Sequence, residues 1–265
     1  HATNIAYPNF AFSNPMETLM AHEFSHHWWG NLVTCRTAAD MWLNEGWAVF
    51  SEHLFLEQQY GKDSYYASIE QRLKDVLQFA HVEDGQVFPL SPVPHGATYG
   101  KHVYDKGALV AHTLRSYLGD SLFFKGIQGY LQAMAFKNAS SIDLRDSLSE
   151  YTGKNLDTFF NNWVFAPGFP HFNLTYSVQP GNHGYEVYAN ITNNPRFNDE
   201  RYGGVPLELW VFDHDWKPHV KGVTLSKNSQ NYKLGGFNGK PELVVLDPVR
   251  KISDARTVDY LTIKD

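Results

Sequence analysis

The stretch AHEFSHHWW (residues 21–29) decides how the rest of this 265-residue chain is interpreted. It contains H-E-x-x-H, in which His22 and His26 are four residues apart. On an α-helix this spacing brings both imidazoles to one face, one turn apart. Two neutral imidazoles and one carboxylate are a typical set of three protein ligands for zinc, with a fourth position left open. Glu23 lies about 100° around the helix, which makes it a candidate general base rather than a ligand.

The residues around this stretch predict a helix from about Pro15 to Trp29 that ends at Gly30-Asn31. A surface helix with solvated histidine and glutamate is the alternative to a metal site. Four apolar side chains border the polar face and favour the metal site. They are Leu19, Met20, Phe24 and Trp28.

A second helix is expected to supply the missing carboxylate. Asp40 can cap a helix from Met41 to about Gln59, which ends at Tyr60-Gly61. Glu45 and Glu52 are seven residues apart, and therefore lie on one face of that helix. One of the two carboxylates can bind the metal while the other orients a ligand from behind. A solvated or ion-paired surface residue is an equal alternative for Glu52.

Composition excludes several classes of protein. A net charge of -6 with both signs mixed along the chain argues against a nucleic-acid binder. The sequence has no apolar run of membrane length and no visible signal peptide. The chain starts at His1 rather than at a methionine, so we expect a fragment of a longer protein, and the compartment stays unknown. The single cysteine, Cys35, excludes an internal disulfide framework.

Further helices are expected downstream, up to about Pro170. The predicted ranges are Ser64–Phe79, Val103–Leu118, Asp120–Phe136, Ser141–Thr152 and Asn155–Phe165. Between the first two lies Glu83–Lys101, which is rich in glycine, proline and histidine and shows no periodicity. Long irregular segments in compact domains are usually functional, so this segment is a candidate wall of the active site. His95 and His102 are candidates to line the substrate cleft.

Beyond Pro170 the pattern changes to short runs rich in β-branched and aromatic residues, separated by turn residues. The predicted strands are Phe172–Val178, Tyr185–Ile191, Leu207–Phe212, Val220–Leu225 and Leu243–Leu246. This spacing indicates an antiparallel β-sandwich. The expected fold is therefore α+β, with a mainly helical domain over residues 1–170 and a small β-sandwich domain over residues 171–265.

Three stretches resemble the gluzincin zinc metallo-aminopeptidases, the family of aminopeptidase N and the leukotriene hydrolase. They are HEFSHHWWGNLVT with WLNEGWAVFSE (residues 22–34 and 42–52), YDKG (residues 104–107), and the segment Trp163–Pro170. The gap of eighteen residues between His26 and Glu45 also matches the family. The resemblance implies a thermolysin-like catalytic domain that binds one zinc ion per chain.

The resemblance also implies a role for each matching residue. His22, His26 and Glu45 are implied zinc ligands, Glu23 the general base and proton shuttle, and Tyr104 the phenol that stabilises the oxyanion. The implied reaction is the release of N-terminal amino acids from peptides by a zinc-activated water.

The chain departs from the family pattern in one segment and in its extent. The family recognises the free amino group of the substrate through a Gly-x-Met-Glu-Asn segment, and the chain begins where that segment ends. An N-terminal β domain, and in some members a C-terminal helical domain, are also absent from the sequence. An endopeptidase, an epoxide hydrolase on the same zinc site and a non-catalytic binding module therefore stay open as alternatives.

Overall fold

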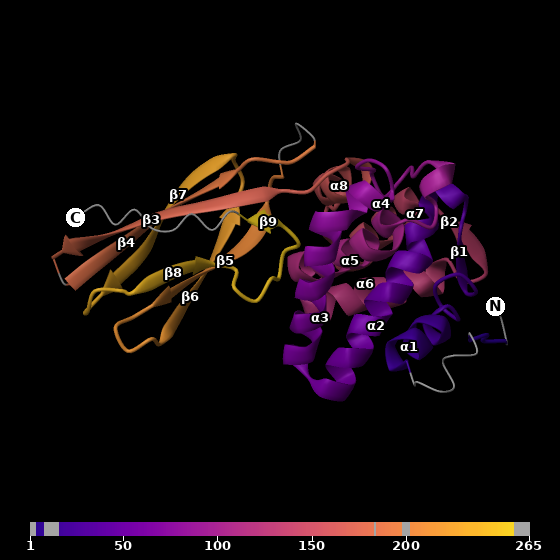
Figure 1. The fold of residues 1–265 in the computed structure, drawn as a ribbon, viewed down its shortest axis with the longest axis horizontal. Helices are drawn as coiled ribbons and strands as arrows, with labels where there is room; N and C mark the ends of the chain where they lie inside the picture. The colour runs from indigo at the N-terminus through magenta and orange to yellow at the C-terminus, as the bar shows by residue number, and fades with distance from the viewer. Residues whose placement is uncertain (1–3, 8–15, 183, 198–201, 257–265) are drawn as a thin grey trace. The chain divides into compact units, whose positions relative to one another are not determined.

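The computed structural model describes residues 4–7, 16–182, 184–197 and 202–256. The chain divides into two compact units, His1–Pro167 and Gly168–Asp265. The first is mainly helical and the second consists of β-strands, which confirms the expected α+β fold (Figure 1).

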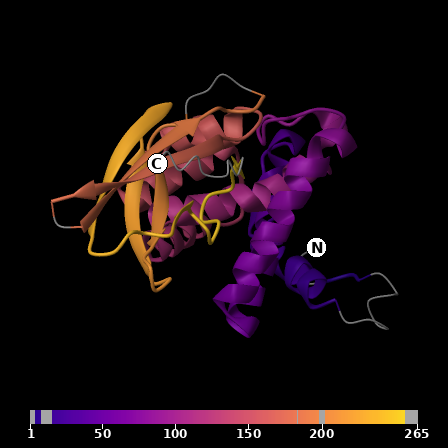
Figure 2. The same ribbon diagram turned by 60° about the vertical axis from the view of Figure 1, so that its left-hand side comes forward.

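The helical unit contains α-helices joined by short 3₁₀ and π-helical segments. In chain order these are α1 (Glu17–Ser25), η2 (Ala38–Leu43), α2 (Glu45–Tyr60), α3 (Lys62–Asp75), η3 (Val76–Ala80), α4 (His81–Glu83), η4 (His95–Ala97), η5 (His102–Lys106), α5 (Gly107–Leu118), α6 (Asp120–Ala133), α7 (Ser141–Thr152), α8 (Asp157–Phe160) and η6 (Asn161–Phe165). Figure 1 shows α2 between α1 and α3, with which it makes extensive contacts. The turned view in Figure 2 again shows the indigo α1 beside these purple helices. Among the described residues, no helix combines the length and the apolar character that crossing a membrane requires.

Helix α1 is shorter than the sequence predicts. It ends at Ser25 instead of Trp29, and its expected start at Pro15 lies outside the described residues. The Ser25 hydroxyl donates to the His22 carbonyl at 2.8 Å, a local bond that competes with the helical pattern. The His27 and Trp28 amides then bond only three residues back, and the chain turns at Gly30 with a positive φ of 122°. After this turn the amides from Asn31 to Val33 bond five residues back.

The second predicted helix is present, but its expected N-cap is wrong. A 3₁₀ segment, η2, precedes α2, and Asp40 lies inside it without capping. The Asp40 carboxylate instead accepts hydrogen bonds from the Ser91 and Ser141 hydroxyls at 2.7 and 2.6 Å. A local capping rule is thus overridden by two partners far along the chain. Gly61 ends α2 with a positive φ of 87°, as expected.

A core of large aromatic side chains fixes α2 against its neighbours. The Trp47 indole stacks on Trp29 with ring centroids 4.6 Å apart and lies parallel to the Phe123 ring at 6.0 Å. Trp42, at the end of η2, is only 1% exposed. Burial of such rings dominates the energetics of a core, so α2 is held firmly in the middle of the unit.

The described residues of the β unit form seven strands. They are β3 (His171–Gly181), β4 (Gly184–Asn193), β5 (Val205–Phe212), β6 (Pro218–Leu225), β7 (Ser229–Phe237), β8 (Leu243–Leu246) and β9 (Ala255–Arg256). They form two sheets, in the orders β7-β4-β3-β9 and β6-β5-β8. All pairs are antiparallel except β3 with β9. Alternate residues along β5 are buried, as in a sandwich with one face of each sheet in the core.

Four of the observed strands are absent from the sequence prediction. Strands β7 and β9 add to the first sheet of the β unit. In the helical unit, β1 (Val33–Cys35) pairs in parallel with β2 (Lys137–Ala139), two strands of three residues each. Strands this short carry too little alternation to be recognised from sequence.

Candidate metal centre

The structure brings together the three predicted metal ligands. The Nε2 atom of His22 lies 3.4 Å from Oε2 of Glu45, and Nε2 of His26 lies 3.5 Å from the same oxygen. One ligand atom from each residue falls within 4.8 Å of the others. Helix α1 supplies His22, its C-cap residue supplies His26, and the first residue of α2 supplies the carboxylate.

These separations fit zinc. Bonds of about 2.0–2.1 Å at a tetrahedral angle place neighbouring ligand atoms roughly 3.3–3.4 Å apart. The observed 3.4 and 3.5 Å lie close to that value. Two imidazoles and one carboxylate are also the donor set that leaves one position open. Both the distances and the chemistry of the cluster therefore suit a catalytic zinc ion.

Hydrogen bonds behind the two imidazoles turn their Nε2 atoms toward the cluster. Nδ1 of His26 donates to the Trp29 carbonyl at 2.8 Å, a contact that the irregular turn after α1 makes possible. Nδ1 of His22 lies 2.9 Å from Oε1 of Glu52. The structure thus separates the two carboxylates of α2, with Glu45 in the cluster and Glu52 behind His22. Partners of this kind fix the ring orientation and tautomer of a metal-binding histidine.

The electrostatics of the cluster favour a positive charge at its centre. Burial lowers the pKa of His22, but hydrogen bonds to Glu45 and Glu52 outweigh it and raise that pKa to about 9. Burial raises the pKa of Glu45, but its hydrogen bonds to the two histidines lower it to about 2. The Glu45 carboxylate is therefore ionised at neutral pH, as a carboxylate that binds a metal must be.

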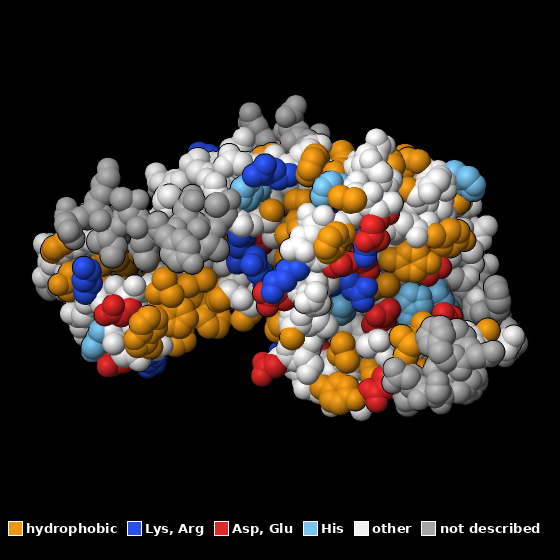
Figure 3. Space-filling view, viewed as in Figure 1, with side chains coloured by type: hydrophobic (Ala, Val, Ile, Leu, Met, Phe, Trp, Pro, Cys, Tyr) orange, Lys and Arg blue, Asp and Glu red, His pale blue; other side chains and the backbone are white. Residues whose placement is uncertain are grey.

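A polar cavity of about 660 Å³ opens at the cluster. Its lining includes the three predicted ligands, Glu23 and Tyr104. The other lining residues are Asn4, Ala6, Leu19, Gly30, Asn31, Asn44, Val49, Glu52, Arg72 and Asp105. On the helical unit, the face drawn in Figure 3 carries acidic and basic side chains intermixed around pale blue histidines (Figure 3).

Tyr104 lies beside the cluster on the π-helical segment η5. Its ring is nearly parallel to that of His22, with an interplanar angle of 9° and centroids 6.3 Å apart. Burial and the neighbouring Glu45 carboxylate raise the pKa of the Tyr104 phenol above its ordinary value. The hydroxyl therefore stays protonated at neutral pH and can donate a hydrogen bond into the cavity.

Two glycines allow the segment that carries Tyr104 to approach the start of α2 closely. The sequence interpretation assigned no role to either glycine. A Cβ atom on Gly46 would lie 2.9 Å from both the Gly107 Cα and the Val103 carbonyl. A Cβ on Gly107 would lie 2.9 Å from the Gly46 Cα. Gly46 follows Glu45 directly, and Gly107 ends the Tyr-Asp-Lys-Gly stretch. The signal was present in the two motifs, since each carries one glycine, directly after Glu45 in the first and three residues after Tyr104 in the second.

The other histidines singled out from the sequence lie outside the cluster. His95 is exposed, and no residue of 84–101 is among those that line the cavity. His102 is buried, with Nδ1 2.6 Å from the Asp84 carboxylate and Nε2 accepting the Phe88 amide. The predicted role of Glu83–Lys101 and of these histidines at the cleft is therefore not supported by the cavity.

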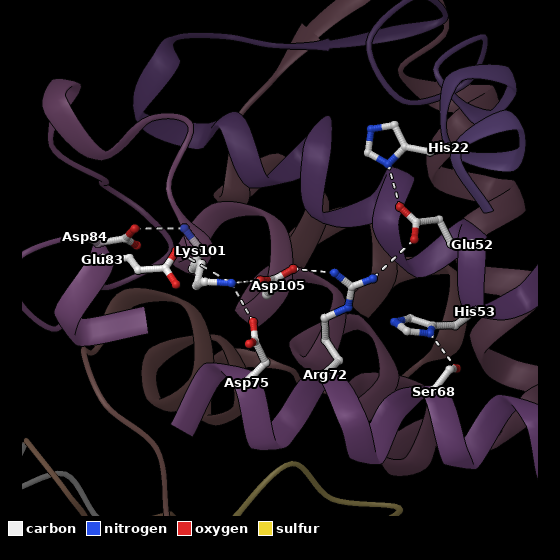
Figure 4. A network of polar contacts seen from close by, with 10 residues as sticks. All are labelled: His22, Glu52, His53, Ser68, Arg72, Asp75, Glu83, Asp84, Lys101 and Asp105. Carbon is white, nitrogen blue, oxygen red and sulfur yellow. Dashed lines mark hydrogen bonds and ion pairs between the residues drawn. The ribbon is translucent and has the colours of Figure 1, made fainter. Parts of the chain in front are cut away.

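Sequence reasoning also missed a network of charged side chains that reaches the cavity. Arg72 on α3 donates to Glu52 at 3.2 Å and to Asp105 at 2.6 Å. Lys101 lies 2.5 Å from Asp75 and 3.5 Å from Asp105. Figure 4 shows these side chains running from His22 to Asp75 (Figure 4). Pairing between separate helices leaves no signal in the spacing along the sequence.

Comparison with known proteins gives a family match over the helical unit. Residues 5–163 match the peptidase family M1 domain. The chain is 32% identical over 162 residues to aminopeptidase N of Lactococcus lactis subsp. lactis, covering 57% of this chain and 19% of that protein. It is 29% identical over 236 residues to probable aminopeptidase 1 of Sulfurisphaera tokodaii, covering 87% of this chain and 28% of that protein. The chain thus spans about a fifth to a quarter of the length of these curated relatives.

A solved structure has a similar fold. The crystal structure of Legionella pneumophila aminopeptidase A in complex with aspartic acid superposes with a TM-score of 0.72 at 17% sequence identity. The match covers 92% of this chain and 27% of that chain. At this identity the likeness concerns the fold.

Proposed function

The chain belongs to peptidase family M1, and from that premise we propose that it is the zinc-dependent catalytic part of an aminopeptidase. Membership confirms the resemblance to the gluzincin aminopeptidases, whose members depend on zinc in general. The observation that carries the proposal is the convergence of His22, His26 and Glu45 within 4.8 Å, beside Glu23 and Tyr104. We assign residues 1–170 to the catalytic domain and residues 171–265 to the β-sandwich domain.

In this proposal each side chain has a separate task. His22, His26 and Glu45 hold one zinc ion per chain. When bound, zinc supplies Lewis acidity, which makes water a nucleophile at neutral pH by lowering its pKa from ~16 to about 7. Glu23 accepts the proton of the attacking water and passes it to the leaving amine. The protonated Tyr104 hydroxyl donates a hydrogen bond to the carbonyl oxygen of the scissile bond as that oxygen becomes negative.

The substrates in this proposal are peptides with a free amino terminus. All the named relatives are aminopeptidases, and a 660 Å³ cavity can take a peptide end. An endopeptidase or an epoxide-opening hydrolase would use the same zinc site, so specificity must be measured. A non-catalytic module is disfavoured because Glu23 and Tyr104 both line the cavity with the three ligands.

Metal analysis combined with amino-acid arylamide substrates tests the proposal. We expect one zinc per chain, and hydrolysis of free-amine arylamides but not of their N-blocked forms. Glu23→Gln should keep zinc while turnover falls about 10²–10⁴-fold, because the general base is lost. Glu45→Ala should lose the metal.

Three results would contradict the proposal. A folded wild-type chain that takes up no zinc would remove the metal site. Equal cleavage of blocked and free substrates would replace an aminopeptidase with an endopeptidase. Unchanged turnover in Glu23→Gln would remove the assigned base.

A further inference from the structure

Arg72 lies on α3, yet its side chain lines the cavity at the predicted zinc site. We propose that Arg72 is a positioning residue that couples the ligand His22 to the segment carrying Tyr104, through the carboxylates of Glu52 and Asp105. The inference rests on the proposed function, because it concerns how that site is held in shape.

On one side, Arg72 acts on a ligand through Glu52. The two oxygens of the Glu52 carboxylate have different partners, as Figure 4 shows. Oε1 lies 2.9 Å from Nδ1 of His22, and Oε2 accepts from Nη2 of Arg72 at 3.2 Å. The guanidinium therefore fixes the rotation of a carboxylate that in turn fixes the imidazole. A ligand held in this way keeps its Nε2 atom aimed at the cluster.

On the other side, Arg72 reaches the segment that carries the phenol. Nη1 donates to Oδ1 of Asp105 at 2.6 Å, and the Asp105 side chain is only 9% exposed. Asp105 is the next residue after Tyr104 in the π-helical η5. Its second oxygen lies 3.5 Å from Lys101. The position of Tyr104 relative to His22 is therefore set by a charged connection across α2, α3 and η5.

The chemistry of arginine suits this task better than that of lysine. A guanidinium presents its N–H groups in a rigid planar fork and can serve two carboxylates with separate arms, whereas an ammonium is a compact point charge. Glu52 and Asp105 are 15% and 9% exposed, so without Arg72 two poorly solvated negative charges would face each other. Both arms of the fork are engaged, which argues against a direct role in holding substrate.

The competing explanation is that Arg72 forms a purely structural ion pair. Measuring zinc affinity distinguishes this explanation from the positioning role. Arg145 on α7 is a matched control, because it also pairs with two carboxylates, Asp146 and Asp157, and is 23% exposed against 27% for Arg72. Arg145 does not line the cavity. Zinc dissociation constants are measured in the full 265-residue chain by competition with a chromophoric chelator. We expect Arg72→Gln to weaken zinc binding about 10–100-fold, and Arg145→Gln to leave it unchanged.

A double-mutant cycle tests whether Arg72 acts through Glu52. In the Glu52→Gln background, Arg72→Gln should weaken zinc binding much less than in the wild type, since the coupling is already broken. Additive effects would overturn this route. Arg72→Lys keeps the charge and guards against misfolding of the Gln variant, and it should lie between wild type and Arg72→Gln. Asp105→Asn should lower kcat more than it changes zinc affinity, because Asp105 is next to Tyr104 in η5 but reaches His22 only through Arg72 and Glu52.

The outcomes distinguish failure of this inference from failure of the proposed function. If the wild type binds zinc and cleaves free-amine arylamides, but Arg72→Gln behaves like Arg145→Gln in zinc affinity and in kcat, the positioning role is overturned and the proposed function stands. If the folded wild type binds no zinc, both are overturned. Loss of thermal stability with unchanged zinc affinity in Arg72→Gln would identify a structural ion pair and would also overturn the inference.

Discussion

Arg72 in the helical unit and Arg256 in the β unit each lie between two carboxylates, and their surroundings differ sharply. Arg72 in the helical unit bonds Glu52 and Asp105, and lines a cavity. Arg256 in the β unit bonds Asp247 and Asp254, whose side chains are both fully buried. Of these two groups, one borders an open cavity and the other lies in an enclosed core.

The enclosed group is bound to the backbone as well as to the carboxylates. The guanidinium of Arg256 donates to the carbonyls of Leu246 and Asp247, and the Asp247 carboxylate accepts the amides of Lys251 and Ile252 at 3.0 Å. Burial raises the pKa of Asp247 to about 6 even beside Arg256, whereas the pKa of Glu45 at the open site is lowered to about 2. Of the two arginines, Arg72 is the one whose ion pairs reach the cavity at the predicted zinc site.

The largest effect on stability that we expect comes from Arg256→Gln. Removing one partner of a buried ion group leaves uncompensated charge, which costs about 3–5 kcal/mol. Urea unfolding should show this loss, while the zinc affinity of the folded variant stays at the wild-type value. Lys233→Gln is a control, because Lys233 is 55% exposed and pairs with Glu186 on the surface, where such pairs contribute at most about 1 kcal/mol. A loss of stability no larger than that of the control would break the comparison between the two arginines.

Most of the site was predictable from sequence because its geometry is local. The His22–His26 spacing fixes one helical face, and Glu23 follows from the same helix. The contacts that support these residues from other helices are not local. The roles of Arg72 and Asp105 depend on contacts between α2, α3 and η5, and Glu45 was separated from Glu52 only by resemblance.

The fold shows the same limit. Helices with clear start and stop signals were predicted closely, as for α7, which spans Ser141–Thr152, although its N-cap is Ser140 and not Ser141 as the sequence suggests. Asp40 looked like a cap but bonds Ser91 and Ser141 instead. Strand β7 was missed because Ser229–Phe237 is polar in its first half and contains two adjacent glycines, which lowers its β-propensity. Its pairing with β4 supplies the order that its own residues do not.

A smaller effect, on both site and stability, is expected from Gly46→Ala. Alanine normally favours a helix over glycine by up to about 1 kcal/mol, but here its Cβ would lie 2.9 Å from backbone atoms of Val103 and Gly107. Overpacking of this kind costs about 1–3 kcal/mol and pushes Glu45 away from Tyr104. We therefore expect lower stability in urea unfolding together with lower kcat, unlike Arg256→Gln, which lowers stability alone.

The matched control for this variant is Gly96→Ala. A Cβ on Gly96 would meet no atom within 4 Å, and the residue does not line the cavity. Stability and kcat should both stay near the wild-type values. If Gly46→Ala also leaves kcat unchanged, the glycine contact does not set the relative position of Glu45 and Tyr104.

The smallest effect concerns His53 in the helical unit. This buried side chain is neutral, whereas the buried Asp247 and Arg256 of the β unit are charged. Its side chain is almost fully enclosed, and burial, helped by the positive charge of Arg72, lowers its pKa to about 3. The Ser68 hydroxyl donates to the Tyr65 carbonyl and so must accept from Nδ1 of His53, at 2.7 Å. Nε2 is buried, and no described residue forms a hydrogen bond with it or offers an acceptor for a second proton.

The sign of the resulting pH dependence follows from the lowered pKa. The unfolded chain takes up a proton at His53 below about pH 6.5, and the folded chain does so only near pH 3. Stability from this group is therefore complete above pH 6.5 and falls by up to about 1.4 kcal/mol for each pH unit below it. His53→Leu should flatten the loss of urea stability between pH 7 and 5, whereas His95→Gln, at an exposed histidine, should keep the wild-type slope. If urea stability depends on pH with an equal slope in wild type and His53→Leu, protonation of the buried His53 imidazole does not cause the acid sensitivity. The sensitivity then arises from charged groups, such as those of the β unit.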